Sequence, residues 1–429
     1  MACFMNVIHI IIFNLLGVVR GQVKVDNDDN IEPFSLLCRI YNVAKNPPIN
    51  YVDLQEPQKI VEEIDTLNSS IWEEKRSNET EHVGNSWEAE LNSAVTKETA
   101  IAHLSINQMT RRAHKILEEI RRMNLSEEIE KAKVEFHKVI YGEDGDEGSL
   151  CHATVRDMDN RSKACGVPGE DARGDHAGNN LVVDFFCLCA QRTEEDGANK
   201  VCGFYVGRIS HFYGWSELGP WGSSTMWASI KGGCGKHMQE HPKSTVEARH
   251  ILDQFLKHLK TGGVYRQMKS GNTGRDIVVE GSERKEGMLG TGVTVSGVSD
   301  FKCDGKEGGK KGSNGASPGG VCVYYGPESK WQNIRWLKQF QTALETVDAA
   351  NNQTAAIQRS IEKLRMLQHR AEEIYETTKV ILEIRNPVGL PAAFQSVGGN
   401  LTAYNATRTR SHSHSHNPYF MPLWVFLFL

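Results

Sequence analysis

The most suggestive spacing for chemistry is His237-Met-Gln-Glu-His241, which matches the His-x-x-Glu-His pattern of inverted zinc peptidases. In those enzymes one helix face presents two imidazoles to zinc and a carboxylate to the attacking water. Here Gly232, Gly233 and Gly235 come just before the motif, and Pro242 disfavours a helical conformation at His241. We therefore expect a turn-rich loop at this position and no zinc site.

A second spacing, Gly315-Ala-Ser317-Pro-Gly319, fits the Gly-x-Ser-x-Gly nucleophile elbow of hydrolases. That elbow uses the backbone N–H after the serine as an oxyanion donor, and Pro318 has no N–H. A loop is the better interpretation. With both motifs set aside, we expect no catalytic residues, no enzyme activity and no cofactor.

The cysteines offer a choice between metal binding and cross-linking. Cys187-x-Cys189 with Cys202 could ligate zinc, but no Cys-x-x-Cys pair occurs, and ten cysteines in a secreted chain favour disulfides. After removal of an N-terminal signal, an odd number remains, so one is free or pairs between chains. The disulfide candidates, whose connectivity stays open, are Cys38, Cys151, Cys165, Cys187, Cys189, Cys202, Cys234, Cys303 and Cys322.

Aromatic residues gather between glycines and serines at Tyr213, Trp215, Trp221 and Trp227. They could stack a ligand, although such residues more often fill a disulfide-rich core, and we expect packing. The tripeptide Arg173-Gly-Asp175 matches an adhesion ligand, but matches of three residues are common by chance.

Composition bounds the class of protein. The chain has 429 residues with 39% hydrophobic and 24% charged content, enough for one large or two ordinary domains. Lys and Arg total 49 against 54 for Asp and Glu, so the net charge is −5. That balance does not favour a nucleic-acid partner.

Both ends of the chain carry targeting signals. The apolar stretch 7–19 followed by Gly21 predicts a secretory signal, removed as residues 1–21. At the other end, small residues at Asn405, a polar spacer and an apolar tail too short to span a bilayer predict a glycosylphosphatidylinositol (GPI) signal. We expect attachment at Asn405, with Ser411 as the fallback, loss of residues 406–429, and a membrane-proximal stalk over 401–405.

Glycosylation sequons support secretion. In each, an asparagine stands two residues before Ser or Thr. Apart from the one at Asn405, they place N-glycosylation candidates at Asn68, Asn78, Asn124, Asn160, Asn352 and Asn400.

Glycine and proline are distributed unevenly along the chain. Residues 58–141 hold one glycine and no proline, and 328–386 hold neither, while 203–330 hold 25 of the 39 glycines. Apolar residues in the two poor stretches recur every three or four positions, with an interruption near Asn351. The sequence therefore predicts helices within 56–141 and 328–386, including one over 87–141.

The rest of the chain is expected to form a head. The cysteine-rich lobe 142–327 joins the two long helical segments, so these should run antiparallel in an elongated coiled-coil-like bundle, with the lobe at one end and the carboxyl terminus near the other. Residues before Glu56 are expected to extend back so that Cys38 reaches the lobe. Within the lobe we expect short strands at 181–188, 201–209 and 293–298, loops that cannot close a large apolar core, and a surface loop 305–320 tied by Cys303 and Cys322.

The fold class predicted from these features is mainly α, with a disulfide-rich α+β or loop head, in a single ectodomain over 22–400. Three stretches add a resemblance. Leu181-Val-Val-Asp-Phe-Phe-Cys-Leu-Cys189, Trp221-Gly-Ser-Ser-Thr-Met-Trp227 followed by Ile230-Lys-Gly-Gly-Cys234, and Gly320-Val-Cys-Val-Tyr-Tyr325 before a long helix resemble African trypanosome variant surface glycoproteins. No cysteine follows Cys322, so the chain is similar to the shorter branch without a cysteine-rich C-terminal domain.

The resemblance implies a dense, GPI-anchored homodimeric coat in the outer leaflet of the plasma membrane. Such a coat shields the cell from host antibodies and is exchanged for antigenically different copies. The alternative is a GPI-anchored receptor that uses the same scaffold to bind a host serum macromolecule.

Overall fold

The computed structural model describes residues 23–78, 86–207, 213–236, 241–270, 277–295, 300–310 and 316–385. The expected signal 1–21, the stalk 401–405, and the attachment signal with Asn405 and Ser411 lie outside these residues. The chain divides into two compact units, which we call unit 1 (Met1–Thr66 with Gln108–His369) and unit 2 (Leu67–Asn107 with Arg370–Leu429).

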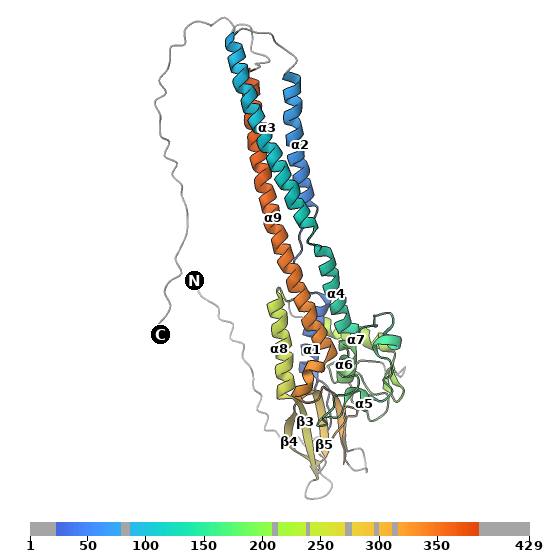
Figure 1. Cartoon of the computed structure of the whole chain (residues 1–429). Helices are drawn as coiled ribbons and strands as arrows, with labels where there is room; N and C mark the ends of the chain where they lie inside the picture. Colours follow the sequence, from blue (N-terminus) through green and yellow to red (C-terminus); the bar gives the residue numbers. More distant parts are fainter. Residues whose placement is uncertain are drawn as a thin grey trace, which may run out of the picture. The chain divides into compact units, whose positions relative to one another are not determined.

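Most of the described chain is helical, and the only long strands belong to one small sheet (Figure 1). The helices are α1 (Ile31–Lys45), α2 (Glu56–Asn78), α3 (Ser86–Arg121), α4 (Leu125–Tyr141), α5 (Arg161–Cys165), α6 (Leu181–Cys189), α7 (Ser223–Lys236), α8 (Thr245–Thr261) and α9 (Arg335–Arg385), with a π-helical turn at Leu150–Thr154 and a 3-10 turn at Glu328–Asn333. The strands are β1 (Gly214–Ser216), β2 (Gly219–Trp221), β3 (Gly263–Ser270), β4 (Ile277–Lys285), β5 (Met288–Val295), β6 (Gly309–Lys310), β7 (Ala316–Ser317) and β8 (Gly319–Tyr324). This confirms a mainly α fold with a disulfide-rich head.

The long helices of unit 1 pack through seams of apolar residues. Ala113, Leu117 and Ile120 of α3 share one buried cluster with Ile357 and Leu364 of α9. Polar contacts fix the directions: Gln58 of α2 pairs with Arg121 of α3 and Asp65 with His114, so these two helices are antiparallel. In the same unit, Phe136 of α4 contacts Phe340 of α9 at 5.6 Å between ring centroids.

The interruption of the α9 pattern near Asn351 has a structural cause. Asn351 Oδ1 accepts from Asn50 N at 2.8 Å, and its Nδ2 donates to Pro48 O at 3.0 Å. One turn later, Thr354 Oγ1 donates to Asn50 O at 3.1 Å. Polar residues here satisfy the backbone of the segment between α1 and α2, which would otherwise lie unpaired against the helix.

Two helical expectations were wrong in detail. The stretch 87–141 is not one helix, because Asn124 adopts a left-handed conformation with φ 49° and separates α3 from α4. Asparagine tolerates this conformation better than other residues with a side chain. The segment before Glu56 is not extended either: α1 is a helix whose Phe34, Leu37, Ile40 and Val43 are completely buried.

The expected strands of the head were wrong at two of three places. Residues 181–188 belong to α6, which begins where the Asn180 side chain accepts a hydrogen bond from Val183 N at 2.9 Å. The described residues of 201–209 form turns. The third strand is confirmed for residues 293–295, as the end of β5, and 296–298 lie outside the described residues.

The main sheet has the order β4-β3-β5-β8. Its central pair, β3 and β5, is parallel, while β4 and β8 join antiparallel on the outer sides. A register shift between Gln267 and Met268 interrupts the β3–β4 pairing.

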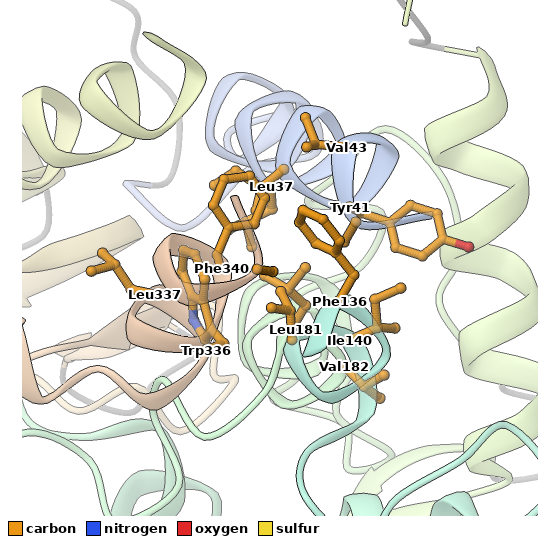
Figure 2. Packing of buried hydrophobic residues seen from close by; sticks show 14 of the residues in the cluster. Leu37, Tyr41, Val43, Phe136, Ile140, Leu181, Val182, Trp336, Leu337 and Phe340 are labelled. Carbon is orange, nitrogen blue, oxygen red and sulfur yellow. The ribbon is translucent and has the colours of Figure 1, made fainter. Parts of the chain in front are cut away.

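The head shares a large apolar core with α1, α4 and α9, although its loops were expected not to close one. All nine residues of α6 are buried, and the helix packs between α1, α4 and β8. Figure 2 shows Leu37 and Tyr41 of α1 close to Phe136 of α4, Leu181 of α6 and Phe340 of α9. The two helices that the sequence pattern missed therefore form the centre of the core.

Unit 2 contains parts of α2, α3 and α9. Ala102 and Ile106 of α3 and Ala371 and Thr378 of α9 are buried, and Thr378 Oγ1 donates to Ile374 O at 2.7 Å. Ile101 and Leu104 of α3 are exposed by 63% and 66%. Among the described residues, no helix has a stretch that is both long and apolar enough to cross a bilayer.

Candidate functional site

The head, by which we mean residues 142–327, is cross-braced by disulfides. The four bonds join Cys38 to Cys234, Cys165 to Cys187, Cys189 to Cys202, and Cys303 to Cys322. Cys187 and Cys189 therefore have different partners and do not form a thiolate metal cluster. No group of His, Cys, Asp and Glu in the described part of the chain could hold a metal ion.

The prediction of one odd cysteine is confirmed within the fold. Cys151 is the free thiol among the cysteines described, and it is exposed in the π-helical turn. The expectation that Cys38 reaches the lobe is also confirmed: its bond to Cys234 ties α1 to α7 across 196 residues of sequence.

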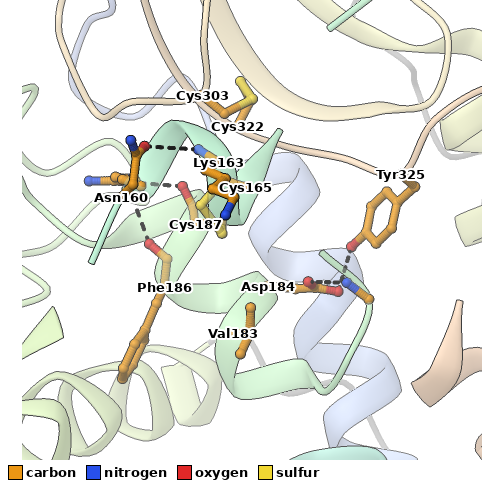
Figure 3. Close-up of a disulfide and its surroundings, with 12 residues drawn as sticks. Asn160, Lys163, Cys165, Val183, Asp184, Phe186, Cys187, Cys303, Cys322 and Tyr325 are labelled. Atoms are coloured by element: carbon orange, nitrogen blue, oxygen red, sulfur yellow. Dashed lines mark hydrogen bonds between the residues drawn. A yellow bond between two sulfur atoms is a disulfide. The ribbon is translucent and has the colours of Figure 1, made fainter. Parts of the chain in front are cut away.

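Asp184 on α6 is a buried carboxylate that holds three parts of the chain together, and Figure 3 shows its hydrogen bond with Tyr325. Its Oδ2 accepts from Tyr325 Oη at 2.8 Å and from Trp336 Nε1 at 2.7 Å, and its Oδ1 accepts from Gly178 N at 2.8 Å. Burial raises the pKa of Asp184 to about 6, although these three hydrogen bonds favour the charged form. The end of β8 and the start of α9 are thereby attached to α6.

Arg161 on α5 is the second buried charge. Its Nη2 donates to Cys187 O at 3.0 Å, and its guanidinium lies 5.1 Å from the ring centroid of Trp215. Burial lowers the pKa of Arg161 to about 9, partly offset by the charge of Asp304. Gly305 has no side chain where the guanidinium passes: a Cβ there would lie 2.3 Å from Arg161 Nη1. The base of the 303–322 segment is thus fitted closely around this side chain.

A buried asparagine completes the polar framework. Asn30 precedes α1 and is 0% exposed. Its Nδ2 donates to Leu188 O of α6 and to Val321 O of β8, both at 2.9 Å. The sequence pattern did not mark Asn30, Arg161 or Asp184 as positioning residues; the one signal available was an acid inside the apolar run of α6.

The aromatic cluster divides between core and surface. Trp215 and Trp227 are 1% exposed, and Trp227 contacts Tyr41 of α1 edge to face at 5.4 Å between centroids. Trp221, in contrast, is 61% exposed at the end of the β1–β2 hairpin, whose turn residue Leu218 is 88% exposed. Packing therefore accounts for Trp215 and Trp227 but not for Trp221.

The zinc-peptidase motif is only partly described. The glycines that precede the motif, Gly232, Gly233 and Gly235, belong to helix α7. Residues 237–240 lie outside the described residues, and His241 is exposed.

The other two motifs lie in ordinary surface positions. Ser317 is exposed in β7, which pairs with β6 in a short hairpin. Arg173 is half-buried and donates through Nη1 to Ala177 O, while Lys163 lies 3.5 Å from Asp175. The Arg-Gly-Asp arginine is thus used inside its own turn.

The sequons occupy different settings. Asn160 caps α5, where its Oδ1 accepts from Lys163 N at 3.0 Å. Asn124 and Asn352 are exposed, and Asn68 of α2 is half-buried. The side chains of Asn78 and Asn400 lie outside the described residues.

The described head presents exposed residues such as Leu218 and Trp221 on a base that disulfides cross-link. The family described as "Trypanosomal VSG domain" matches residues 72–366. The chain is also similar to a Trypanosoma congolense protein described as "Variant surface glycoprotein YnAT 1.3", with 25% identity over 249 residues. That alignment covers 57% of this chain and 52% of the relative, so the chain spans about half the length of the relative it matches.

Proposed function

Because the chain belongs to the trypanosomal VSG domain family, we propose that it is a surface coat glycoprotein that shields the parasite plasma membrane sterically. The observation that carries this proposal is the family match over 72–366, which includes the braced head. Shielding requires a folded protein at high density on the membrane surface, and it involves no catalytic step. The coat would be exchanged for antigenically different copies during immune evasion.

The contrast between base and loops in the head supports a role in antigenic variation. Leu218 and Trp221 are exposed, whereas the neighbouring Trp215 and Trp227 are buried. Exposed loop residues contribute little to core packing, so their substitution changes the surface that antibodies meet and leaves the fold intact. The Cys303–Cys322 bond holds the base of a second surface segment in the same way.

The proposed attachment is a GPI lipid in the outer leaflet, at Asn405 or, failing that, at Ser411. A spacer and an apolar tail of the expected lengths follow these positions in the sequence. Treating intact cells with phosphatidylinositol-specific phospholipase C should release the protein into the medium. Retention on the cell after verified lipid cleavage argues against this attachment.

The receptor alternative makes a different prediction for the isolated protein. A coat protein presents no dedicated surface for one host macromolecule, so immobilised protein passed over with serum should retain no component saturably. Saturable capture of a single serum component would overturn the coat proposal in favour of a receptor.

We further propose that the coat form is a homodimer. Exposed Ile101 and Leu104 on α3, beside a groove of about 520 Å³ that includes Ile374 and Ile381 of α9, support an apolar contact within unit 2. Sedimentation should give the mass of two chains. The double substitution Ile101→Asp with Leu104→Asp should reduce the sedimenting mass to that of one chain. Leu218→Asp, a control at another exposed apolar residue, should leave the dimer unchanged.

A further inference from the structure

The break between α3 and α4 carries both a modification motif and a cavity. Asn124 stands at the break, exposed and left-handed, and begins the sequon Asn124-Leu-Ser126. Both Asn124 and Ser126 line an open groove of about 540 Å³ in unit 1. The residue to which a glycan would be attached therefore forms part of the groove wall.

The groove has the amphipathic character that suits a sugar ring. Its floor is apolar, with Leu117 and Ile120 of α3 and Ile357 of α9 almost fully buried. Its rim combines Leu54, which is 42% exposed, with Gln58 and Arg121, which hydrogen-bond each other. An N-acetylglucosamine presents a face of C–H groups and an acetyl methyl to such a floor, and its hydroxyl and amide groups to such a rim.

The other described sequons lack this combination. The Asn160 side chain caps α5. In the Asn352 sequon, Thr354 is 1% exposed and its hydroxyl donates a hydrogen bond to Asn50 O. Asn68 is half-buried and its Oδ1 is enclosed without a hydrogen-bond partner.

We propose that Asn124 carries an N-linked glycan and that the first N-acetylglucosamine lies in the groove lined by Leu117, Ile120 and Ile357. The Nδ2 atom forms the bond to C1 of the sugar, and the polyisoprenoid pyrophosphate of the oligosaccharide donor leaves from C1. The amide proton goes to solvent through the transferase. The second Nδ2 hydrogen remains, so the hydrogen bond from Asn124 to Glu127 is kept. The inference rests on the proposed function, since only a secreted chain meets that donor.

The placement makes a physical prediction beyond site occupancy. A sugar packed on apolar side chains must leave the groove before a glycan-cleaving amidase can reach the Nδ2–C1 bond. Removal of the Asn124 glycan from native protein should be about tenfold slower than removal of an unpacked glycan, which corresponds to about 1.4 kcal/mol of closing free energy. After denaturation the two rates should be equal.

The experiment uses the full chain expressed with its signals in a secretory host. Peptide mass spectrometry after amidase treatment in heavy-oxygen water should label Asn124, and Ser126→Ala should abolish the label. The control glycan is placed on the exposed face of α4 by Lys131→Asn with Lys133→Thr in the Ser126→Ala background. Leu54→Asp should remove much of the native protection at Asn124, while Leu218→Asp should not.

The outcomes separate the two levels of the proposal. An unmodified Asn124 in a chain that has lost residues 1–21 and formed its disulfides overturns this inference and leaves the coat function standing. A modified Asn124 whose glycan is released as fast as the control overturns the placement in the groove. Retention of residues 1–21 inside the cell contradicts the coat function itself.

Discussion

The head and the helical part of unit 1 reach stability by different means. The head combines disulfides with buried polar groups such as Asp184, which accepts three hydrogen bonds, and Arg161, which donates through Nη2 to the backbone of α6. The helical part, by which we mean 56–66, 108–121 and 350–369, relies on apolar seams flanked by exposed ion pairs such as Glu56 with Arg365. In the helical part the residue pattern itself maintains the fold, whereas in the head disulfides and buried polar contacts reinforce an apolar core and leave loop residues unconstrained.

Removing the disulfide that closes the longest loop should cause the largest loss of stability. In the chain-entropy account, a disulfide stabilises in proportion to the logarithm of the loop it closes. The Cys38–Cys234 bond closes 196 residues, so Cys38→Ala with Cys234→Ala should lower the free energy of unfolding by about 5 kcal/mol. Urea unfolding followed by circular dichroism measures the change.

The matched control is the shortest cross-link. Cys189 and Cys202 are 13 residues apart, and their replacement by alanine should cost about 3 kcal/mol. An equal loss from both pairs would show that loop length does not set their contributions, and that local packing around each bond does.

The pH dependence of unfolding should distinguish the buried acid of the head. An aspartate in the unfolded chain has a pKa of about 3.9, and burial raises the pKa of Asp184 to about 6. Because the folded pKa is the higher one, the stability that Asp184 contributes is complete below about pH 4 and is lost as pH rises through about 6, by on the order of 2–3 kcal/mol. Burial lowers the pKa of His176 and His258, so the stability that these residues contribute changes with pH in the opposite direction. The quantity to measure is therefore the free energy of unfolding of the wild type minus that of Asp184→Asn, as a function of pH.

A surface acid provides a control of opposite sign. At Asp348 on α9, burial is outweighed by hydrogen bonds from Thr245 Oγ1 and Arg249 Nη2, both 2.5 Å, and the pKa is lowered. The stability that Asp348 contributes is present above its pKa in the unfolded chain and is lost as the pH falls through its pKa in the folded chain. The free energy of unfolding of the wild type minus that of Asp348→Asn should therefore decrease on acidification. The corresponding difference for Asp184→Asn should increase.

The smallest effect is expected from an exposed ion pair of the helical part. Arg365 contacts Glu56 and Glu362, and its side chain is 51% exposed. Water and salt screen such pairs, so Arg365→Met should shift the urea midpoint less than any change above, and about 0.5 M sodium chloride should remove the difference. A shift as large as that from the Asp184 substitution would mean that ion pairs, not seams, maintain this part of the fold.

The sequence pattern predicted helices correctly where one face is buried and the other is exposed, because apolar residues then recur with the helical period. The long helices have one apolar face, so their positions follow from spacing and from the absence of glycine and proline. The break at Asn124 could not be predicted because it uses an asparagine in a left-handed conformation, with no glycine or proline to mark it.

In the head the same reasoning failed for a physical reason. Helix α6 is buried on every side, so its apolar run has no period and resembles a buried strand. The cap at Asn180 was the usable signal for a helix start. The disulfide pairing and the partners of Asp184 depend on chain segments that are distant in sequence, so local patterns carry no information about them.

The position of α1 at the centre of the core affects how the chain can be made. This helix is among the first parts to be synthesised, yet its disulfide partner Cys234 and its packing partner α8 follow about 200 residues later. At about 5–20 residues per second, α1 waits on the order of 10–40 s for them. During that interval α4 and α6, which also pack against α1, are synthesised first, so Phe34, Leu37 and Ile40 gain part of their native cover before α8 and Cys234 complete the contacts of this helix.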